Sequence, residues 1–314
     1  MFPLFIPSYH RPDKLLTVEL FLAHGWSPKM IYVVVDDEGG DEAEYRAACE
    51  RYGVNLRVFC LAEARAKHDF VFRQFAGRRS VGVARNWFPE LARAEGFDRY
   101  FVIDDDTRNL DIFHHGVRYA ISLPSAATPK RGELVERVVE AVFGFMRERH
   151  IGHFGLSQTG EIFGGCTSIL LRKKVMNFSF YDLEYMHGGE RGFLDIDTSQ
   201  FAGMYNEGLF CGSFGSGLVL CQTPAATSPG GSTEMYQSAR MIVQALEVPI
   251  QFPSAVYAEH QKMNGGRIHH HIVNKYLMPR LLKVPGGRGN IAWDTYPEDV
   301  PFTNQPKRKG VLCD

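Results

Sequence analysis

The feature of this sequence that most constrains its fold is a regular alternation of short apolar runs with amphipathic stretches over the first third of the chain. The runs LFIP, MIYVVV, NLRVFC and YFVI have the length and the β-branched and aromatic content of buried strands. The stretches between them, such as RPDKLLTVELFLAHG and DEAEYRAACERYG, have helical spacing and end at Gly25 and Gly53. This order predicts an α/β fold, with a Rossmann-like, mostly parallel twisted sheet and flanking helices.

The second half of the chain is less regular. Helical spacing is clear in RGELVERVVEAVFGFMRERH and in EMYQSARMIVQAL, and GSGLVLCQ has the composition of a strand. From about residue 265 the chain is rich in Gly, Pro, His and basic residues and shows little periodicity. We therefore expect one domain with halves at residues 1–115 and 116–264, followed by an irregular C-terminal extension, residues 265–314, that wraps on the core.

Composition narrows the class of protein. The chain has 314 residues, of which 45% are hydrophobic, enough for a large core. No apolar run approaches the roughly 20 residues that span a bilayer, and the N-terminus lacks the basic start of a signal peptide. The six cysteines show no C-x-x-C spacing, which is typical of a reduced cytoplasmic chain. The net charge of −1 means that a nucleic-acid partner would need a local basic surface. The oligomeric state stays open.

Polar residues follow three of the predicted strands. In a parallel sheet the ligand crevice lies outside the carboxyl ends of the strands, so these residues are expected to meet at one edge. Clustered carboxylates there suit Mg²⁺ or Mn²⁺, which prefer oxygen ligands. The alternatives are a solvated acidic turn after the fourth strand and a helix cap after the second. The residues at this edge are Pro7, Ser8 and Tyr9, then Asp36 and Asp37, and then Asp104, Asp105 and Asp106.

Two finer expectations concern this edge. In an extended backbone Asp104 and Asp106 point to one side, so one carboxylate could ligate a metal while the other accepts hydrogen bonds from a sugar hydroxyl. Arg85, in the segment RRSVGVARN, lies near a predicted helix start. A guanidinium there suits a diphosphate, although a surface helix arginine explains the same position equally well.

The ordered set of P-S-Y-x-R-P, an acid cluster, an A-R-N helix and FVIDDD resembles the nucleotide-sugar half of GT-A-fold glycosyltransferases. The resemblance implies that residues 1–115 bind the donor and residues 116–264 bind the acceptor. It also implies a divalent metal, Mn²⁺ or Mg²⁺, bound by Asp104, Asp106 and a C-terminal histidine, nominally His271 of the run His269–His271. The implied donor-binding residues are Pro7, Ser8, Tyr9, Arg11, Asp36, Asp37, Arg85, Asp104, Asp105 and Gly165.

The later segment from GGCTSILLRKK to GGERGFLDIDTSQFA is similar to the acceptor half of the same family. The resemblance implies that the base which deprotonates the acceptor is Asp195, or Asp197 if the register differs. This chain has Leu194 where the family usually has a glutamate. That departure leaves both the identity of the base and the stereochemical outcome open.

The segments IPSYHRP, GVARN and IDDD most resemble the phage and kinetoplastid-type enzymes that glycosylate hydroxymethylated DNA pyrimidines, including the base J glucosyltransferase. This implies UDP-glucose as donor and hydroxymethyluracil or hydroxymethylcytosine in DNA as acceptor, in the host cytoplasm if the gene belongs to a bacteriophage. Arg78, Arg79 and Lys262 are then candidate phosphate contacts.

Other functions fit some of the same residues. A GT-A enzyme with a carbohydrate, protein or lipid acceptor fits the net charge of the chain. A nucleotidyltransferase would also use carboxylates with Mg²⁺, but it usually brings a glycine-rich phosphate loop, which IPSYHRP is not. A non-catalytic nucleotide-sugar-binding module would need no Asp195.

Overall fold

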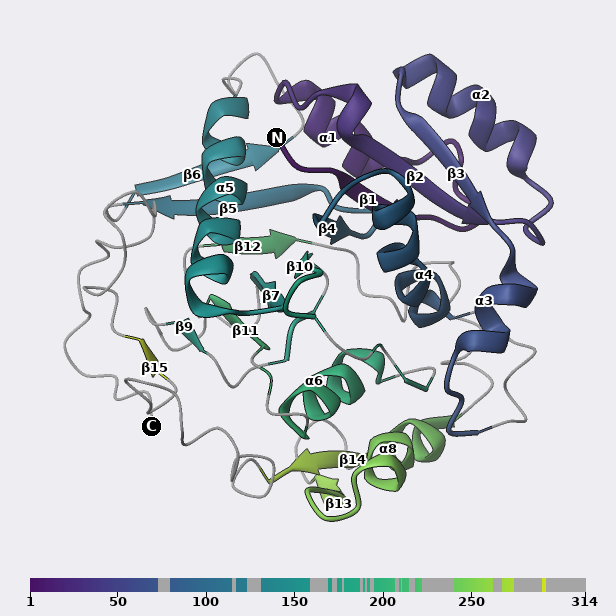
Figure 1. The fold of residues 1–314 in the computed structure, drawn as a ribbon, viewed down its shortest axis with the longest axis vertical. Helices are drawn as coiled ribbons and strands as arrows, with labels where there is room; N and C mark the ends of the chain where they lie inside the picture. Colours follow the sequence, from purple (N-terminus) through teal and green to yellow (C-terminus); the bar gives the residue numbers. More distant parts are fainter. Residues whose placement is uncertain are drawn as a thin grey trace.

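The structure is a computed structural model, shown in Figure 1. It describes residues 1–72, 80–114, 117–122, 131–158, 169–170, 174–176, 178–186, 189, 191–192, 195–206, 209, 211–214, 218–221, 240–261, 267–273 and 290–291. The candidate residue Gly165 and the candidate DNA contacts Arg78, Arg79 and Lys262 lie outside these ranges.

The central feature is a nine-stranded mixed sheet with the order β15-β9-β11-β7-β10-β4-β1-β2-β3. Its N-terminal half is parallel, since β1 pairs with both β2 and β4, and β2 pairs with β3, all in the same direction. The predicted α/β class is thereby confirmed. These four strands are β1 (Leu4–Pro7), β2 (Ile31–Asp36), β3 (Asn55–Phe59) and β4 (Arg99–Ile103).

The C-terminal half of this sheet departs from the parallel pattern. β10 runs antiparallel to β4 and to β7, and β11 is parallel to β7. β9 pairs antiparallel with both β11 and β15. The bounds are β7 (His153–Gly155), β9 (Ile169–Leu170), β10 (Phe178–Asp182), β11 (Cys211–Phe214) and β15 (Asn290–Ile291).

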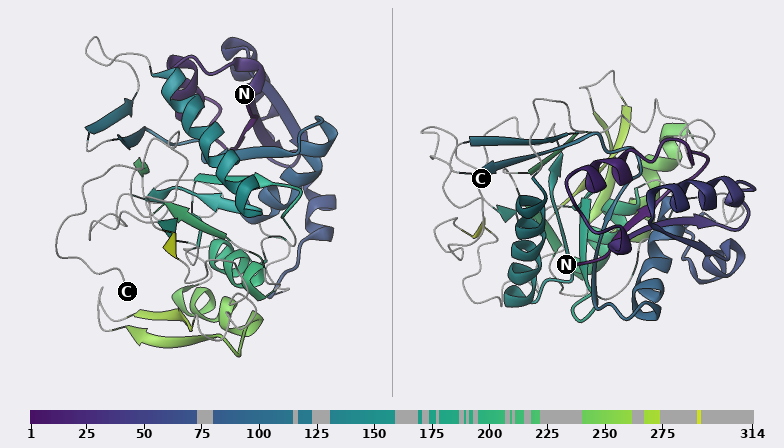
Figure 2. Two further views of the ribbon diagram at one scale, coloured as in Figure 1. Left: turned by 60° about the vertical axis from the view of Figure 1, so that its left-hand side comes forward. Right: turned by 90° about the horizontal axis from the view of Figure 1, so that it is seen from above.

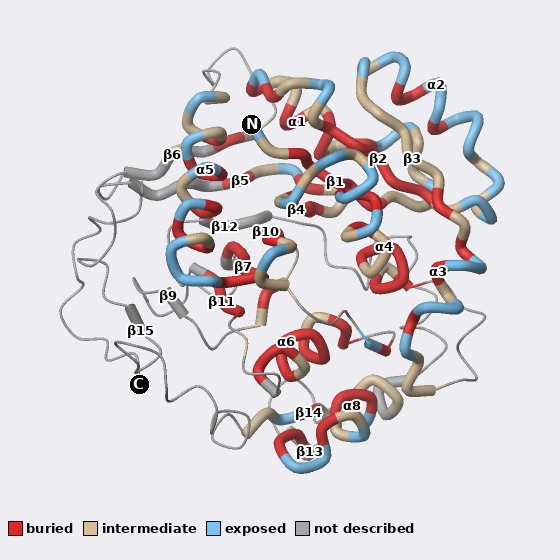
Figure 3. The backbone as a smooth tube through the Cα atoms, in the orientation of Figure 1, coloured by how far each residue is buried: buried red, intermediate tan, exposed pale blue. Residues whose placement is uncertain are grey.

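Helices cover both faces of the parallel strands, and alternate residues of each strand point to opposite faces. Leu4 and Ile6 pack in one core with α1, α2 and α5, whereas Phe5 packs in a second core with α3 and α4. This is why the strands read as continuous apolar runs. Figure 3 shows the buried segments along β1 and β2. The helices are α1 (Leu16–Ala23), α2 (Glu42–Tyr52), α3 (Leu61–Lys67), α4 (Val81–Ala94) and α5 (Gly132–Arg149), with a 3-10 turn η1 (Pro28–Met30).

A second, four-stranded sheet has the order β6-β5-β12-β8. A third core joins α6, α8 and a two-stranded hairpin of β13 and β14, which lie together in the lower part of Figure 1 and of the left view of Figure 2. The hairpin crosses the boundary that we predicted at residue 264, and that boundary stays a prediction. The bounds are β5 (Asn109–His114), β6 (Val117–Ser122), β8 (Ser157–Gln158), α6 (Ile196–Asn206), β12 (Leu218–Cys221), α8 (Arg240–Gln251), β13 (Val256–Gln261) and β14 (Arg267–Ile272).

Local sequence explains the ends of α2. Gly53 adopts the left-handed conformation, with φ of 67°, that favours glycine after a helix. Asp41 occupies the N-cap position, but its carboxylate makes no capping hydrogen bond and pairs instead with His10 at 3.0 Å. Within the described ranges, none of the helices combines the length and apolar character needed to cross a bilayer.

Candidate functional site

The carboxyl ends of β1, β2 and β4 meet at one edge, and Asp105 lies at the centre of a hydrogen-bond network there. Its carboxylate accepts a hydrogen bond from Ser8 Oγ at 2.5 Å and another from Arg11 at 2.9 Å. Since the single proton of the Ser8 hydroxyl goes to Asp105, Tyr45 donates its own to Ser8 Oγ at 2.7 Å. Tyr45 also accepts the backbone N–H of Arg11 at 3.0 Å. Asp105, only 5% exposed, therefore fastens the loop after β1 to β4 and α2.

Burial is the largest influence on the pKa of Asp105. It raises the pKa of this carboxyl to about 7, although Arg11 and Ser8 lower it. The predicted substrate-binding residues Ser8, Arg11 and Asp105 are thus brought together, but chiefly to bind one another.

Asp104 and Asp106 lie at the same strand end with their side chains 28% and 20% exposed. Arg85 donates to Asp104 at 2.9 Å, and Arg11 donates to Asp106 at 3.4 Å. Burial, with the charge of Asp104, raises the pKa of Asp106. The carbonyl of Asp104 accepts hydrogen bonds from the hydroxyls of Thr17 and Thr107, which hold the backbone in place.

The fit of this edge to a divalent metal can be judged from its donors. Among the described residues, no three His, Cys, Asp or Glu side chains converge as a metal site. Asp104 and Asp106 are two partly exposed oxygen donors in adjacent positions, which suits Mg²⁺ or Mn²⁺ when substrate phosphates complete the coordination. The edge therefore fits a metal shared with a substrate, and it does not form a closed protein site.

The acids after β2 divide into two roles. Asp37 accepts the backbone N–H of Leu61 at 2.9 Å and so satisfies a donor in the first turn of α3. This is the capping alternative, realised at α3 and not at α2. Asp36, half-buried at the end of β2, accepts the N–H of Glu38 at 3.0 Å. Pro7 is the last residue of β1 and is buried, and the ring of Tyr9 lies against His10, with ring centroids 3.9 Å apart.

Arg85 lies in α4 and is only 8% exposed, which excludes the surface-arginine interpretation. Besides its bond to Asp104, its charge contributes to lowering the pKa of Asp197 and of His153. Arg85 therefore sits between the edge that carries Asp104 and the start of α6. It connects the two halves of the chain electrostatically.

Asp195 directly precedes α6 and is 5% exposed. Its Oδ2 lies 3.0 Å from Nδ1 of His270, which is 7% exposed, within ion-pair distance but not aligned as a hydrogen bond. Gln244, on α8, donates to the other carboxylate oxygen at 3.3 Å. The backbone N–H of Asp195 donates to Glu247, also on α8, at 3.2 Å.

Asp197, two residues later, has a different environment. Lys174 binds its carboxylate at 2.8 Å, and the side chain is 16% exposed. Burial alone would raise the pKa of Asp197, but Lys174, a backbone hydrogen bond from Thr198 and the charge of Arg85 together hold it below its ordinary value. Asp197 is therefore a stabilised anion, whereas Asp195 faces a histidine.

The three consecutive histidines alternate along β14. His270 points into the core toward Asp195, while His271 pairs with Glu259 at 3.3 Å and is 48% exposed. His271, the nominal metal ligand, thus lies on the face of the hairpin opposite His270. Strand alternation predicts that His269 and His271 share one face of an extended segment and that His270 points away, but it does not predict which face is buried.

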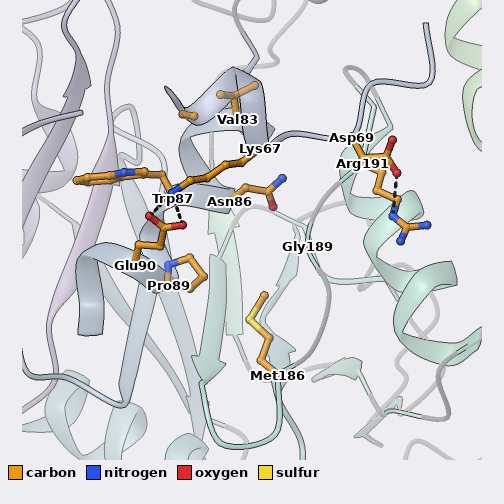
Figure 4. A pocket seen from close by; sticks show the side chains of 11 residues that line it. Lys67, Asp69, Val83, Asn86, Trp87, Pro89, Glu90, Met186, Gly189 and Arg191 are labelled. Carbon is orange, nitrogen blue, oxygen red and sulfur yellow. Dashed lines mark hydrogen bonds and ion pairs between the residues drawn. The ribbon is translucent and has the colours of Figure 1, made fainter. Parts of the chain in front are cut away.

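A pocket of about 270 Å³ lies between α3, α4 and the segment before Asp195. In Figure 4, Asn86 points toward Gly189, and ion pairs join Lys67 to Glu90 and Asp69 to Arg191 at the sides of the pocket. The sequence reasoning did not identify this pocket. The residues that line it are Ala64, Lys67, Asp69, Val83, Asn86, Trp87, Pro89, Glu90, Met186, Gly189 and Arg191.

Comparison with known proteins bears on the edge that carries Asp104. Residues 2–125, which span β1 to β6, match the TET-associated glycosyltransferase family. Over these residues the chain is similar to glycosyltransferases of that family. The matched part of the chain contains the loop after β1, Arg85 and the aspartates after β4. A comparison with curated proteins gave no match.

Two solved structures resemble parts of the chain. One is a cytidylyltransferase from Leptospira borgpetersenii serovar Hardjo-bovis (strain JB197), with 10% identity, a TM-score of 0.31, and 58% of this chain and 60% of that chain covered. The match therefore spans less than two thirds of the cytidylyltransferase. The other is mouse xyloside xylosyltransferase 1 in its apo form, with 7% identity, a TM-score of 0.30, and 59% and 68% covered.

Proposed function

We propose that this protein is a metal-dependent glycosyltransferase that moves glucose from UDP-glucose to a hydroxymethylated pyrimidine base in DNA, in the cytoplasm. The observation that carries the proposal is the match of residues 2–125 to the TET-associated glycosyltransferase family, together with the resemblance of IPSYHRP, GVARN and IDDD to enzymes that glycosylate hydroxymethylated DNA pyrimidines. The pair of buried Arg85 and partly exposed Asp104 at the edge of the parallel strands supports it, because that edge is where such sheets bind nucleotides.

On this proposal, residues 1–115 bind the donor, with Asp36, at the end of β2, near the nucleoside. Asp104 and Asp106 would hold Mn²⁺ or Mg²⁺, which supplies positive charge to the leaving diphosphate. Arg85 would exchange part of its contact with Asp104 for a phosphate oxygen, which its planar guanidinium suits. Asp105 would hold the loop after β1 in place and would not contact the substrate.

Asp195 is the better candidate for the base that deprotonates the acceptor. The carboxylate of Asp197 is stabilised by Lys174, which makes it a weaker proton acceptor. Asp195 has Gln244 and the neighbouring His270 to orient it. In the reaction the acceptor hydroxyl loses its proton to Asp195, its oxygen bonds to the sugar carbon, and the bond from that carbon to the diphosphate breaks.

The acceptor is the part of the proposal that needs the most direct test. A duplex hides the hydroxymethyl group from a crevice, so the base would be flipped out or taken from a single strand. The net charge of −1 equally suits a carbohydrate, protein or lipid acceptor.

The experiment measures transfer of radiolabelled glucose from UDP-glucose, with Mn²⁺, to DNA containing 5-hydroxymethyluracil or 5-hydroxymethylcytosine. Unmodified DNA and a glycan or peptide acceptor are the controls. We expect transfer to at least one modified DNA, none to unmodified DNA, and loss of transfer with EDTA. Transfer to the glycan or peptide alone would contradict the DNA acceptor, and full activity in EDTA would contradict the metal.

Two matched variants test the base. Because a general base typically contributes a rate factor of about 10²–10⁴, Asp195→Asn should lose roughly that much kcat with little change in UDP binding. Asp197→Asn removes the partner of Lys174 and should cost less kcat. The reverse order of the two losses would assign the base to Asp197.

A further inference from the structure

His68 joins the donor half of the chain to the segment that leads to Asp195. Its ring is 7% exposed, and its two nitrogens contact two different parts of the protein. Nε2 lies 2.8 Å from the carbonyl oxygen of Gly192, and Nδ1 lies 2.7 Å from Nδ2 of Asn86, on α4. A carbonyl oxygen only accepts hydrogen bonds, so Nε2 carries the proton and Nδ1 accepts from the Asn86 amide. Both contacts are satisfied only by the neutral imidazole with its proton on Nε2.

The segment held by His68 is fastened at further points. The N–H of Gly192 donates to the carbonyl of Asp69 at 3.1 Å, next to the histidine contact. The hydroxyl of Ser199, on α6, accepts the N–H of Arg191 at 3.0 Å and donates to its carbonyl at 2.8 Å. Residues 191–192 are therefore clamped between α6 on one side and the end of α3 on the other.

Gly192 also packs against Glu247, the residue that binds the backbone of Asp195. Its φ of 78° is in the left-handed region, and a Cβ there would come within 2.4 Å of Glu247 Oε1. The other carboxylate oxygen of Glu247 accepts the backbone N–H of Asp195 at 3.2 Å. A shift of Gly192 would therefore be transmitted through Glu247 to Asp195.

We propose that His68 is a positioning residue for Asp195: through Gly192 it holds the acceptor-side carboxylate at a set distance from α4, which carries Arg85 of the donor edge. Asn86, the residue next to Arg85, orients the imidazole for this task. Asn86 is itself packed against the same segment, since a Cβ on Gly189 would lie 2.6 Å from its Oδ1, as Figure 4 shows from the pocket side. This inference rests on the proposed role of Asp195.

Two substitutions separate the contacts of His68. In His68→Gln the amide nitrogen takes the place of Nε2 and still donates to the Gly192 carbonyl. In His68→Asn the shorter amide takes the place of Nδ1, so it keeps a partner for Asn86 and loses the bond to Gly192. Because a misplacement of about 1 Å can cost about 10²-fold in rate, His68→Asn should lose tenfold or more in kcat. His68→Gln should restore most of it, and the KM for the donor should change little in either variant.

A second readout follows the segment itself and does not depend on turnover. Hydrogen exchange of the amides in residues 191–200 should be faster in His68→Asn than in His68→Gln, because local opening is easier once the Gly192 bond is lost. Ser199→Ala releases the same segment from α6 and should also speed its exchange and lower kcat. It keeps the test available if His68→Asn does not fold.

Equal kcat and equal exchange in the Asn and Gln variants would overturn the proposal, because it attributes the effect to the bond with Gly192. If the wild-type protein transfers glucose to no acceptor, the proposed function fails, while the exchange comparison still decides whether His68 fastens the segment. If exchange differs but kcat does not, the segment is tethered without positioning Asp195, and the proposal is again overturned.

Discussion

Asp105→Asn should stabilise the protein in a strongly pH-dependent way. In the folded protein burial raises the pKa of Asp105 from 3.8 to about 7. The folded state therefore keeps a proton on this carboxyl that the unfolded state releases above about pH 4. Stability contributed by the protonated group is fully present below the unfolded pKa and is lost as the pH rises toward the folded pKa. Asparagine resembles the protonated carboxyl at every pH and avoids that loss.

The magnitude follows from the two pKa values. The difference between 3.8 and about 7 corresponds to about 4 kcal/mol of unfolding free energy over the whole window, and to about 3 kcal/mol between pH 5 and pH 8. In Asp105→Asn the amide oxygen can still accept the hydrogen bond from Arg11. The amide nitrogen cannot accept from Ser8 and donates a hydrogen bond to the Ser8 hydroxyl instead. The rearranged hydrogen bond to Ser8 changes the unfolding free energy of the variant by the same amount at pH 5 and at pH 8, so it cancels when the two pH values are compared.

The assay is urea unfolding of the wild type and of Asp105→Asn at pH 5 and pH 8. The quantity of interest is the difference in unfolding free energy between the two proteins, because all other titrating groups are common to both. Asp13→Asn, which removes an exposed carboxylate from the loop after β1, is the matched control for the loss of one carboxylate. If the difference between Asp105→Asn and the wild type is the same at pH 5 and pH 8, the reasoning from burial is refuted.

Two further predictions concern His153 and Asp106. Burial, with the charge of Arg85, lowers the pKa of His153 to about 3, and neither ring nitrogen has a hydrogen-bond partner among the described residues. The folded protein favours the neutral form of His153, so the free energy of unfolding decreases as the pH falls below about 6.5. His153→Phe should remove this decrease and so gain about 2 kcal/mol of unfolding free energy over the wild type at pH 5. Urea unfolding of both proteins at pH 5 and pH 8 measures the gain. Asp106→Asn should lose most glucose transfer, because it removes a proposed metal ligand. Its thermal midpoint should stay equal or rise, because the substitution also removes a like charge beside Asp104. Near-normal turnover of this variant with saturating Mn²⁺ would place the metal elsewhere.

The sequence alone determined the parallel half of the fold and the edge where its strands end. Continuous apolar runs, helical spacing and the glycines after α1 and α2 are local signals, and each acts within a few residues of where it stands. The separation of Asp105 from Asp104 and Asp106 does not follow from strand alternation, because β4 ends at Ile103 and Asp105 and Asp106 lie in the turn after it.

Only the tertiary structure decided which of these side chains are free for a substrate. Asp37 caps α3, a helix that begins 24 residues later, and Asp105 is occupied by Ser8, 97 residues earlier. His270 and not His271 lies beside Asp195, because of which face of β14 packs against Asp195. The His68 contact with Gly192 joins residues 124 positions apart. Such pairings depend on how helices and strands pack in three dimensions. The local sequence around one residue of a pair does not indicate which distant residue it will contact.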